Sequence, residues 1–124
     1  MTISPLFSSL DLALPEIETL GKLRAPTEAC GVLLDTAWQK ADGTLSWVKE
    51  LPNRSLQAGM YEIDMKDLQQ VLEGLEDVED IAIWHTHPSG YIGPSQGDMR
   101  NRPGSEVMML VVSLTEIGPI PTWF

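Results

Sequence analysis

The chain has 124 residues, 43 % of them hydrophobic, and a formal net charge of −10. This length and composition suit one compact domain, so we expect residues 1–124 to form a single domain. The excess of carboxylates repels nucleic-acid phosphates and anionic lipids, which argues against both as partners. No segment has the roughly 18 consecutive apolar residues of a membrane span. The N-terminal residues lack the basic start of a secretory signal, which favours a cytoplasmic location.

The first half of the chain predicts one helix followed by a β-hairpin. The helix is expected over Pro15–Arg24, because proline suits a first helical turn and the acidic and basic side chains lie at the ends that the helix dipole favours. Pro26 is expected to end it. Two strands follow over Ala29–Trp38 and Thr44–Leu51, joined by the Asp-Gly pair at 42–43, which is typical of a hairpin turn.

The second half predicts strands that alternate with short helices. In chain order we expect a short strand over Met60–Ile63, a helix over Met65–Asp77 capped by Asp64, a buried strand over Ile81–His87, a short helix starting at Ser95, a central strand over Val107–Leu114 and a last extended segment over Gly118–Phe124. A mixed β-sheet flanked by helices places the chain in the α/β (α+β) class.

Two histidines, His85 and His87, are the only ones in the chain, and both end a predicted strand. Residues i and i+2 of a strand point to the same side, so the two imidazoles can chelate one metal ion. The alternative is a pair of loop histidines without a ligand, and a His-x-His pair alone does not decide between the two.

The third ligand of such a site must be a carboxylate or Cys30, because no further histidine exists. Asp98 follows His87 by 11 residues, and the glycines and prolines between them allow the chain to turn back. Two histidines, one aspartate and a water make the open site of a catalytic zinc. Ser95 is expected to cap a short helix that carries Asp98, and its hydroxyl can also stabilise an oxyanion.

Glu28 lies between the end of a predicted helix and the start of a predicted strand, where nothing local requires an acid. It is either a solvated surface glutamate or the base that takes a proton from the metal's water and passes it to a leaving amine. Cys30 is expected to be a small buried hydrophobe.

These residues occur in an order that resembles the JAMM signature of the JAB1/MPN/Mov34 zinc metalloprotease family: a glutamate, then His-x-His-Pro, then Ser-x-x-Asp. The segments "PTEACGVLL", "LPNRS" and "YEID" are also similar to stretches of family members. The resemblance implies a cytidine-deaminase-like MPN/JAMM domain that binds one Zn²⁺ and hydrolyses peptide or isopeptide bonds. It implies His85, His87 and Asp98 as metal ligands, Glu28 as the general acid/base and Ser95 as the oxyanion-stabilising residue.

The form of the signature is similar to that of prokaryotic and phage members, including JAMM domains of phage tail assembly proteins. The alternative function is therefore a phage tail protein in which the domain is chiefly a structural or binding module, located in the host cytoplasm or the virion. The expected partners are a peptide, ubiquitin-like or cell-wall peptide substrate and, in the phage alternative, other tail proteins.

Other zinc sites fit the sequence poorly. A structural zinc scaffold needs four protein ligands, usually rich in cysteine, and only three good ligands are expected to converge here. A nucleoside deaminase needs a Cys-x-x-Cys pair and a zincin needs His-Glu-x-x-His, and neither is present.

Overall fold

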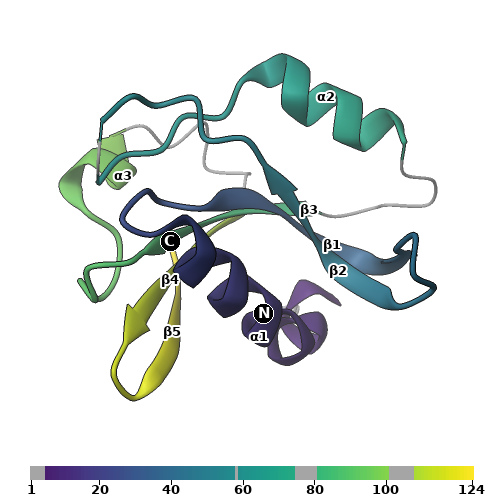
Figure 1. The fold of residues 1–124 in the computed structure, drawn as a ribbon, viewed down its shortest axis with the longest axis horizontal. Coiled ribbons are helices and arrows are strands. Elements are labelled where there is room, and N and C mark those ends of the chain that lie inside the picture. The colour runs from purple at the N-terminus through teal and green to yellow at the C-terminus, as the bar shows by residue number, and fades with distance from the viewer. Residues whose placement is uncertain (1–4, 58, 75–80, 101–107) are drawn as a thin grey trace.

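The computed structural model describes residues 5–57, 59–74, 81–100 and 108–124, with residues 5–8 described as backbone only. They form an α+β fold in which a mixed five-stranded sheet lies between helices (Figure 1). The strand order is β2-β1-β3-β4-β5; β3 and β4 run parallel, and the other neighbours run antiparallel. The elements are α1 Pro5–Arg24, β1 Cys30–Gln39, β2 Leu45–Leu51, α2 Met65–Glu73, β3 Ile81–His87, α3 Gln96–Arg100, β4 Met108–Thr115 and β5 Gly118–Trp123.

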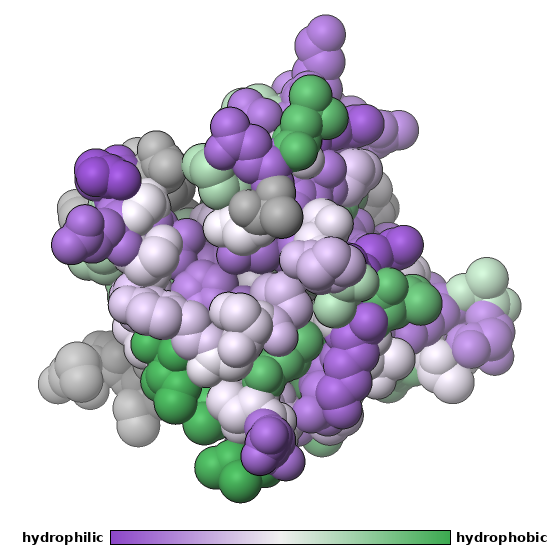
Figure 2. All heavy atoms as spheres, turned by 60° about the vertical axis from the view of Figure 1, so that its left-hand side comes forward, coloured by the Kyte–Doolittle hydropathy of each residue, from purple (hydrophilic) through white to green (hydrophobic). Residues whose placement is uncertain are grey.

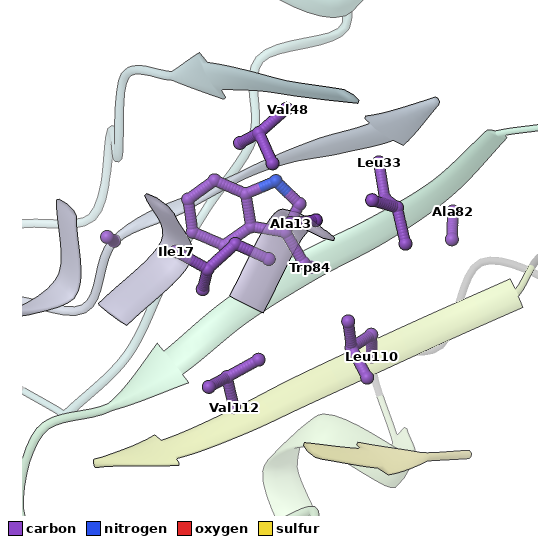
Figure 3. Packing of buried hydrophobic residues seen from close by; sticks show 9 residues of the cluster. Ala13, Ile17, Leu33, Val48, Ala82, Trp84, Leu110 and Val112 are labelled. Carbon is purple, nitrogen blue, oxygen red and sulfur yellow. The ribbon is translucent and has the colours of Figure 1, made fainter. Parts of the chain in front are cut away.

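The main hydrophobic core lies between α1 and one face of the sheet. Figure 3 shows the indole of Trp84 packed beside Ile17 and Val48. Gly31 of β1 pairs with Trp84 of β3, and a Cβ atom at position 31 would lie only 2.8 Å from the indole. The glycine therefore lets the indole lie flat against the sheet. A smaller cluster on the opposite face packs α2 against β1 and β2 (Val32, Leu34, Leu51 and Leu68).

Helix α1 begins ten residues earlier than the sequence predicts, because it starts at Pro5 and carries Pro15 in its interior. Proline lacks the N–H that would bond to the carbonyl of Asp11 one turn earlier. Asp11 and Pro15 are both exposed, so water can satisfy that carbonyl. Apolar residues on either side of the proline, Ala13 and Ile17, are buried against the sheet. Packing thus continues through Pro15 and outweighs the local break.

The predicted strand over Met60–Ile63 is wrong. This segment is held by the backbone bond from Arg54 N to Glu62 O (2.9 Å) and by the side chain of Asn53, and it pairs with no strand of the described sheet. The other predicted strands are present with bounds within one or two residues, except that Val107, the predicted start of the central strand, lies outside the described residues. The turn at Asp42-Gly43 joins β1 to β2. Gly43 has the positive φ of 89° that this turn requires.

Helix α2 starts where the sequence predicts, with the Asp64 carboxylate accepting from Lys66 N. It ends at Glu73 with Gly74 as its C-cap, and the rest of the predicted helix, through Asp77, lies outside the described residues. Within the described part of the chain, no helix combines the length and apolar character needed to cross a membrane.

Candidate metal centre

The five residues predicted from the sequence lie together at one end of the sheet. His85 and His87 close β3 and point to the face opposite α1, whereas Trp84 and Thr86 point toward α1. Glu28 stands two residues before Cys30, which pairs with His85 across the β1–β3 ladder. Glu28, His85 and His87 are all at most 5 % exposed. The short helix α3 brings Asp98 to them.

The two imidazoles converge on a single carboxylate oxygen. Asp98 Oδ2 lies 3.1 Å from Nε2 of His85 and 3.1 Å from Nε2 of His87. Glu28 approaches from the other chain segment, with its Oε2 3.9 Å from Nε2 of His87. Glu28 also shares a compact group with the two histidines, in which one ligand atom of each lies within 4.8 Å of the others. The two histidines are therefore shared by two arrangements: a compact group with Glu28, which Asp98 does not join, and a close approach to Asp98 Oδ2.

The ring of His87 is oriented by a hydrogen bond on its far side. Its Nδ1 lies 3.2 Å from the carbonyl oxygen of Tyr91, which also accepts from the Ser113 hydroxyl at 2.6 Å. A carbonyl only accepts, so Nδ1 must carry the proton of this bond. Nε2 is therefore the nitrogen that faces Asp98, at 3.1 Å, and its lone pair becomes available to a metal ion when its proton is lost, as in metal-ligating histidines whose other nitrogen is held by a carbonyl.

His85 is fully buried and makes no hydrogen bond through either ring nitrogen to the described residues. Its Nε2 is close to Asp98 but does not have hydrogen-bond geometry. Aromatic rings surround it instead: Tyr61 stacks on it at 4.2 Å between centroids, and Phe124 meets it edge-on at 6.1 Å. A buried nitrogen without a partner is costly in free energy unless something else binds it.

Ser95 and Asp98 form the predicted reciprocal cap at the start of α3. Asp98 N–H donates to Ser95 Oγ at 3.1 Å, and Ser95 N–H donates to Asp98 Oδ2 at 2.9 Å. These bonds fix the orientation of the carboxylate toward the histidines.

The titration of these groups follows from burial and from their mutual charges. Burial would raise the pKa of Asp98, but the close approach of both histidine rings outweighs burial and holds that pKa well below its ordinary range. Burial lowers the pKa of His85 despite the neighbouring carboxylate. For His87 the effect of burial is outweighed by the bond to Asp98 and the charge of Glu28, so its pKa is raised. The Glu28 carboxyl has a pKa of about 7, chiefly because it is buried.

This donor set fits a divalent transition metal. Two imidazole Nε2 atoms and one carboxylate oxygen, in a site with a second carboxylate beside them, are the ligand types of an open zinc site. The partnerless Nε2 of His85 and the inward lone pair of His87 both point to where a cation would be held. Cys30 does not belong to the compact group of Glu28, His85 and His87, and its Sγ contacts Leu51 O at 3.6 Å.

Two hollows open at the site. One is a groove of about 710 Å³, lined near the histidines by Ser95, Asp98 and Tyr61. Farther from them, apolar side chains such as Met60 and Met65 line the same groove. The other, of about 610 Å³, contains Glu28 and Asn53 and is more polar. Figure 2, in which the side with α3 is turned forward, shows a largely hydrophilic centre with apolar side chains gathered below it.

The sequence did not single out two contributors to the site, Tyr61 and Asn53. The Asn53 side chain donates to Glu28 O at 2.9 Å, and Tyr61 stacks on His85. The only signal in the sequence was that both lie in the segments "LPNRS" and "YEID", which resemble stretches of family members.

The fold and the donor set define an α+β domain with a buried site suited to a metal. A family model described as prokaryotic homologues of the JAB domain matches residues 13–123, so the chain belongs to this family.

Two solved structures resemble the fold. The solution structure of a Desulfitobacterium hafniense protein is 19 % identical, with a TM-score of 0.71, over 91 % of this chain and 79 % of that one. The solution structure of a Salinibacter ruber protein is 21 % identical, with a TM-score of 0.55, over 91 % and 76 %. No curated protein matches the chain. None of the matches described here refers to a phage, so the phage-tail alternative stays a prediction.

Proposed function

We propose that this protein is a zinc-dependent metallopeptidase that hydrolyses a peptide or isopeptide bond. His85, His87 and Asp98 would hold the zinc ion, and Glu28 would be the general acid/base. The observation that carries the proposal is the convergence of both Nε2 atoms on one carboxylate oxygen, each at 3.1 Å, beside a groove that can receive a chain.

A bound zinc ion supplies a Lewis acid that lowers the pKa of water and polarises a carbonyl group. Glu28 would accept the proton of this water and later donate it. Its Oε1 is buried and has no hydrogen-bond partner among the described residues, so it is free to accept a proton from water. A carboxyl pKa of about 7 is suited to taking that proton and returning it to a leaving amine near neutral pH.

Ser95 is the proposed oxyanion-stabilising residue. Its Oγ accepts from Asp98 N–H, which leaves its own hydroxyl hydrogen available to a substrate oxygen. Ser95 also lines the larger groove, where a substrate carbonyl would lie next to the metal ligands. The proposed substrates are a peptide, a ubiquitin-like tail or a cell-wall peptide that enters this groove.

The proposal gives different roles to two carboxylates, and substitutions can separate them. Glu28→Gln should keep the zinc but reduce hydrolysis of a peptide and isopeptide panel by about 10²- to 10⁴-fold, because the proton carrier is gone. Asp98→Asn should lose the zinc, since the amide removes the anionic ligand. Zinc content and turnover are measured on the same preparations.

Glu116→Gln is the matched control, because it removes one negative charge from an exposed position. It should retain both zinc and turnover. The assignment of roles is wrong if Glu28→Gln loses the metal while Asp98→Asn retains it, and the enzyme proposal is wrong if Glu28→Gln cleaves the panel as fast as wild type.

A further inference from the structure

The two candidate ligand histidines are held by different means. His87 is oriented by a hydrogen bond from its Nδ1 to Tyr91 O. His85 has no hydrogen bond on Nδ1 or Nε2 within the described part of the chain. A metal-ligating histidine usually needs its second nitrogen anchored to fix the plane of the ring. Among the described residues, the plane of His85 is therefore fixed by contacts other than hydrogen bonds.

Tyr61 lies in the position to do this. Its ring is stacked on the His85 imidazole with 4.2 Å between centroids and 18° between planes. The contact is thus made by the ring face, which resists tilting of the imidazole about its Cβ–Cγ bond.

Tyr61 needs an anchor of its own, because its segment belongs to no strand. Asn53 provides it on both sides of the tyrosine. The Asn53 amide nitrogen donates to Met60 O at 3.0 Å, and its Oδ1 accepts from Glu62 N at 3.0 Å. The two peptide groups that flank Tyr61 are therefore bound to one side chain.

The same amide reaches the candidate general base. Asn53 Nδ2 also donates to Glu28 O at 2.9 Å, and Oδ1 accepts from Ser55 N at 2.9 Å. Two N–H donors and two lone pairs are all that an asparagine side chain has, so its capacity is fully used. Neither Asp, which has no donor, nor Ala can replace it at this point.

We propose that Tyr61 and Asn53 act as one positioning unit, in which the tyrosine ring fixes the plane of the His85 ligand and the asparagine holds that ring in place relative to Glu28. Both are positioning residues and neither binds the metal. This inference rests on the proposed zinc site.

The test compares zinc dissociation constants, measured by competition with a chromophoric chelator, for wild type, Tyr61→Phe and Tyr61→Leu. Phenylalanine keeps the stacked ring and should bind zinc as wild type does. Leucine removes the ring and should weaken binding by about 10- to 100-fold, the usual effect of losing a group that orients a ligand. Cobalt in place of zinc should give a wild-type visible spectrum in Tyr61→Phe and an altered one in Tyr61→Leu.

Leu56→Ala is the matched control, because this side chain belongs to the same segment and is fully exposed. It should leave zinc affinity unchanged. The thermal unfolding midpoint of each metal-free variant is measured, so that zinc affinities are compared at a temperature at which every variant is folded. Asn53→Ala should weaken zinc binding in the same way, and the double variant with Tyr61→Leu should lose no more than the larger single loss.

Three results would overturn the inference: wild-type affinity in Tyr61→Leu, an equal loss in Tyr61→Phe, or fully additive losses at positions 53 and 61. The comparison of Tyr61→Phe with Tyr61→Leu tests the inference even if Asn53→Ala does not fold. A wild-type protein that binds no zinc would instead refute the proposed function on which the inference rests.

Discussion

At the residue scale, His85 and His87 enter the site with opposite tendencies to carry charge. Burial lowers the pKa of His85 below its ordinary value, which favours the neutral form that a metal ligand needs. His87 has a raised pKa, because Asp98 and Glu28 outweigh the effect of burial. In the metal-free protein the proton on Nε2 of His87 occupies the same place as a metal would, and metal and proton must compete for it.

This competition predicts the pH dependence of zinc affinity. The pKa of His87 is raised above that of an ordinary histidine, so protonated His87 persists to higher pH. Zinc affinity should therefore fall as pH is lowered through that pKa and level off above it. Dissociation constants measured between about pH 6 and pH 8 test this.

Glu28→Gln provides the control for the same measurement. The charge of Glu28 helps to raise the pKa of His87, so removing it should move the fall in affinity to lower pH. An affinity that does not change with pH in either protein would contradict this account of the histidines.

The residues with distinctive chemistry could be predicted from the sequence, whereas the residues that orient them could not. His85, His87 and Asp98 stood out because two histidines and a turn-rich loop limit the ways of building a site. Asn53 follows a proline, and a Pro-Asn pair is typical of an ordinary turn. Its role depends on backbone groups up to 25 residues away, which no local pattern reveals.

At the element scale, β3 carries the two proposed histidine ligands on one face and binds the segment just before β1 on the other. Thr86 N–H donates to Ala29 O at 2.9 Å, and Ala29 N–H donates to the Thr86 hydroxyl at 3.0 Å. Both residues are buried. This pair of bonds fixes the segment that contains Glu28 relative to the two histidines.

Thr86→Val should therefore destabilise the protein, because valine has the same shape but leaves the buried Ala29 N–H without an acceptor. The expected loss is about 1–3 kcal/mol in the free energy of unfolding, measured by urea denaturation. Thr86→Ser keeps the hydroxyl and should lose less. Equal stability of wild type and Thr86→Val would show that the bond to Ala29 contributes nothing.

Most elements could be predicted because their apolar residues recur with a regular period. The strand Ile81–His87 is present with the expected bounds. It could be predicted because a buried apolar run next to a turn-rich loop has few other interpretations. The first ten residues of α1 were missed, because Pro15 locally favours a helix start while burial of Ala13 and Ile17 favours continuation. Only the tertiary contact decides between these two tendencies.

At the scale of the whole molecule, the site joins segments from distant parts of the chain. Glu28 precedes β1, the histidines end β3, Asp98 lies in α3 and the edge of Phe124 meets His85 from the C-terminus. The strand order β2-β1-β3-β4-β5 that brings them together is not readable from local periodicity. Because the ligands meet only in the folded chain, metal binding should stabilise the fold.

The proposed site should hold one zinc ion, and metal analysis of the purified protein beside Asp98→Ala tests this. Both proteins are supplied with zinc, dialysed against metal-free buffer and analysed by mass spectrometry for metal per chain. We expect one zinc per wild-type chain and a clear loss in Asp98→Ala. A wild-type protein without stoichiometric zinc, or an Asp98→Ala variant that holds as much zinc as wild type, would contradict it.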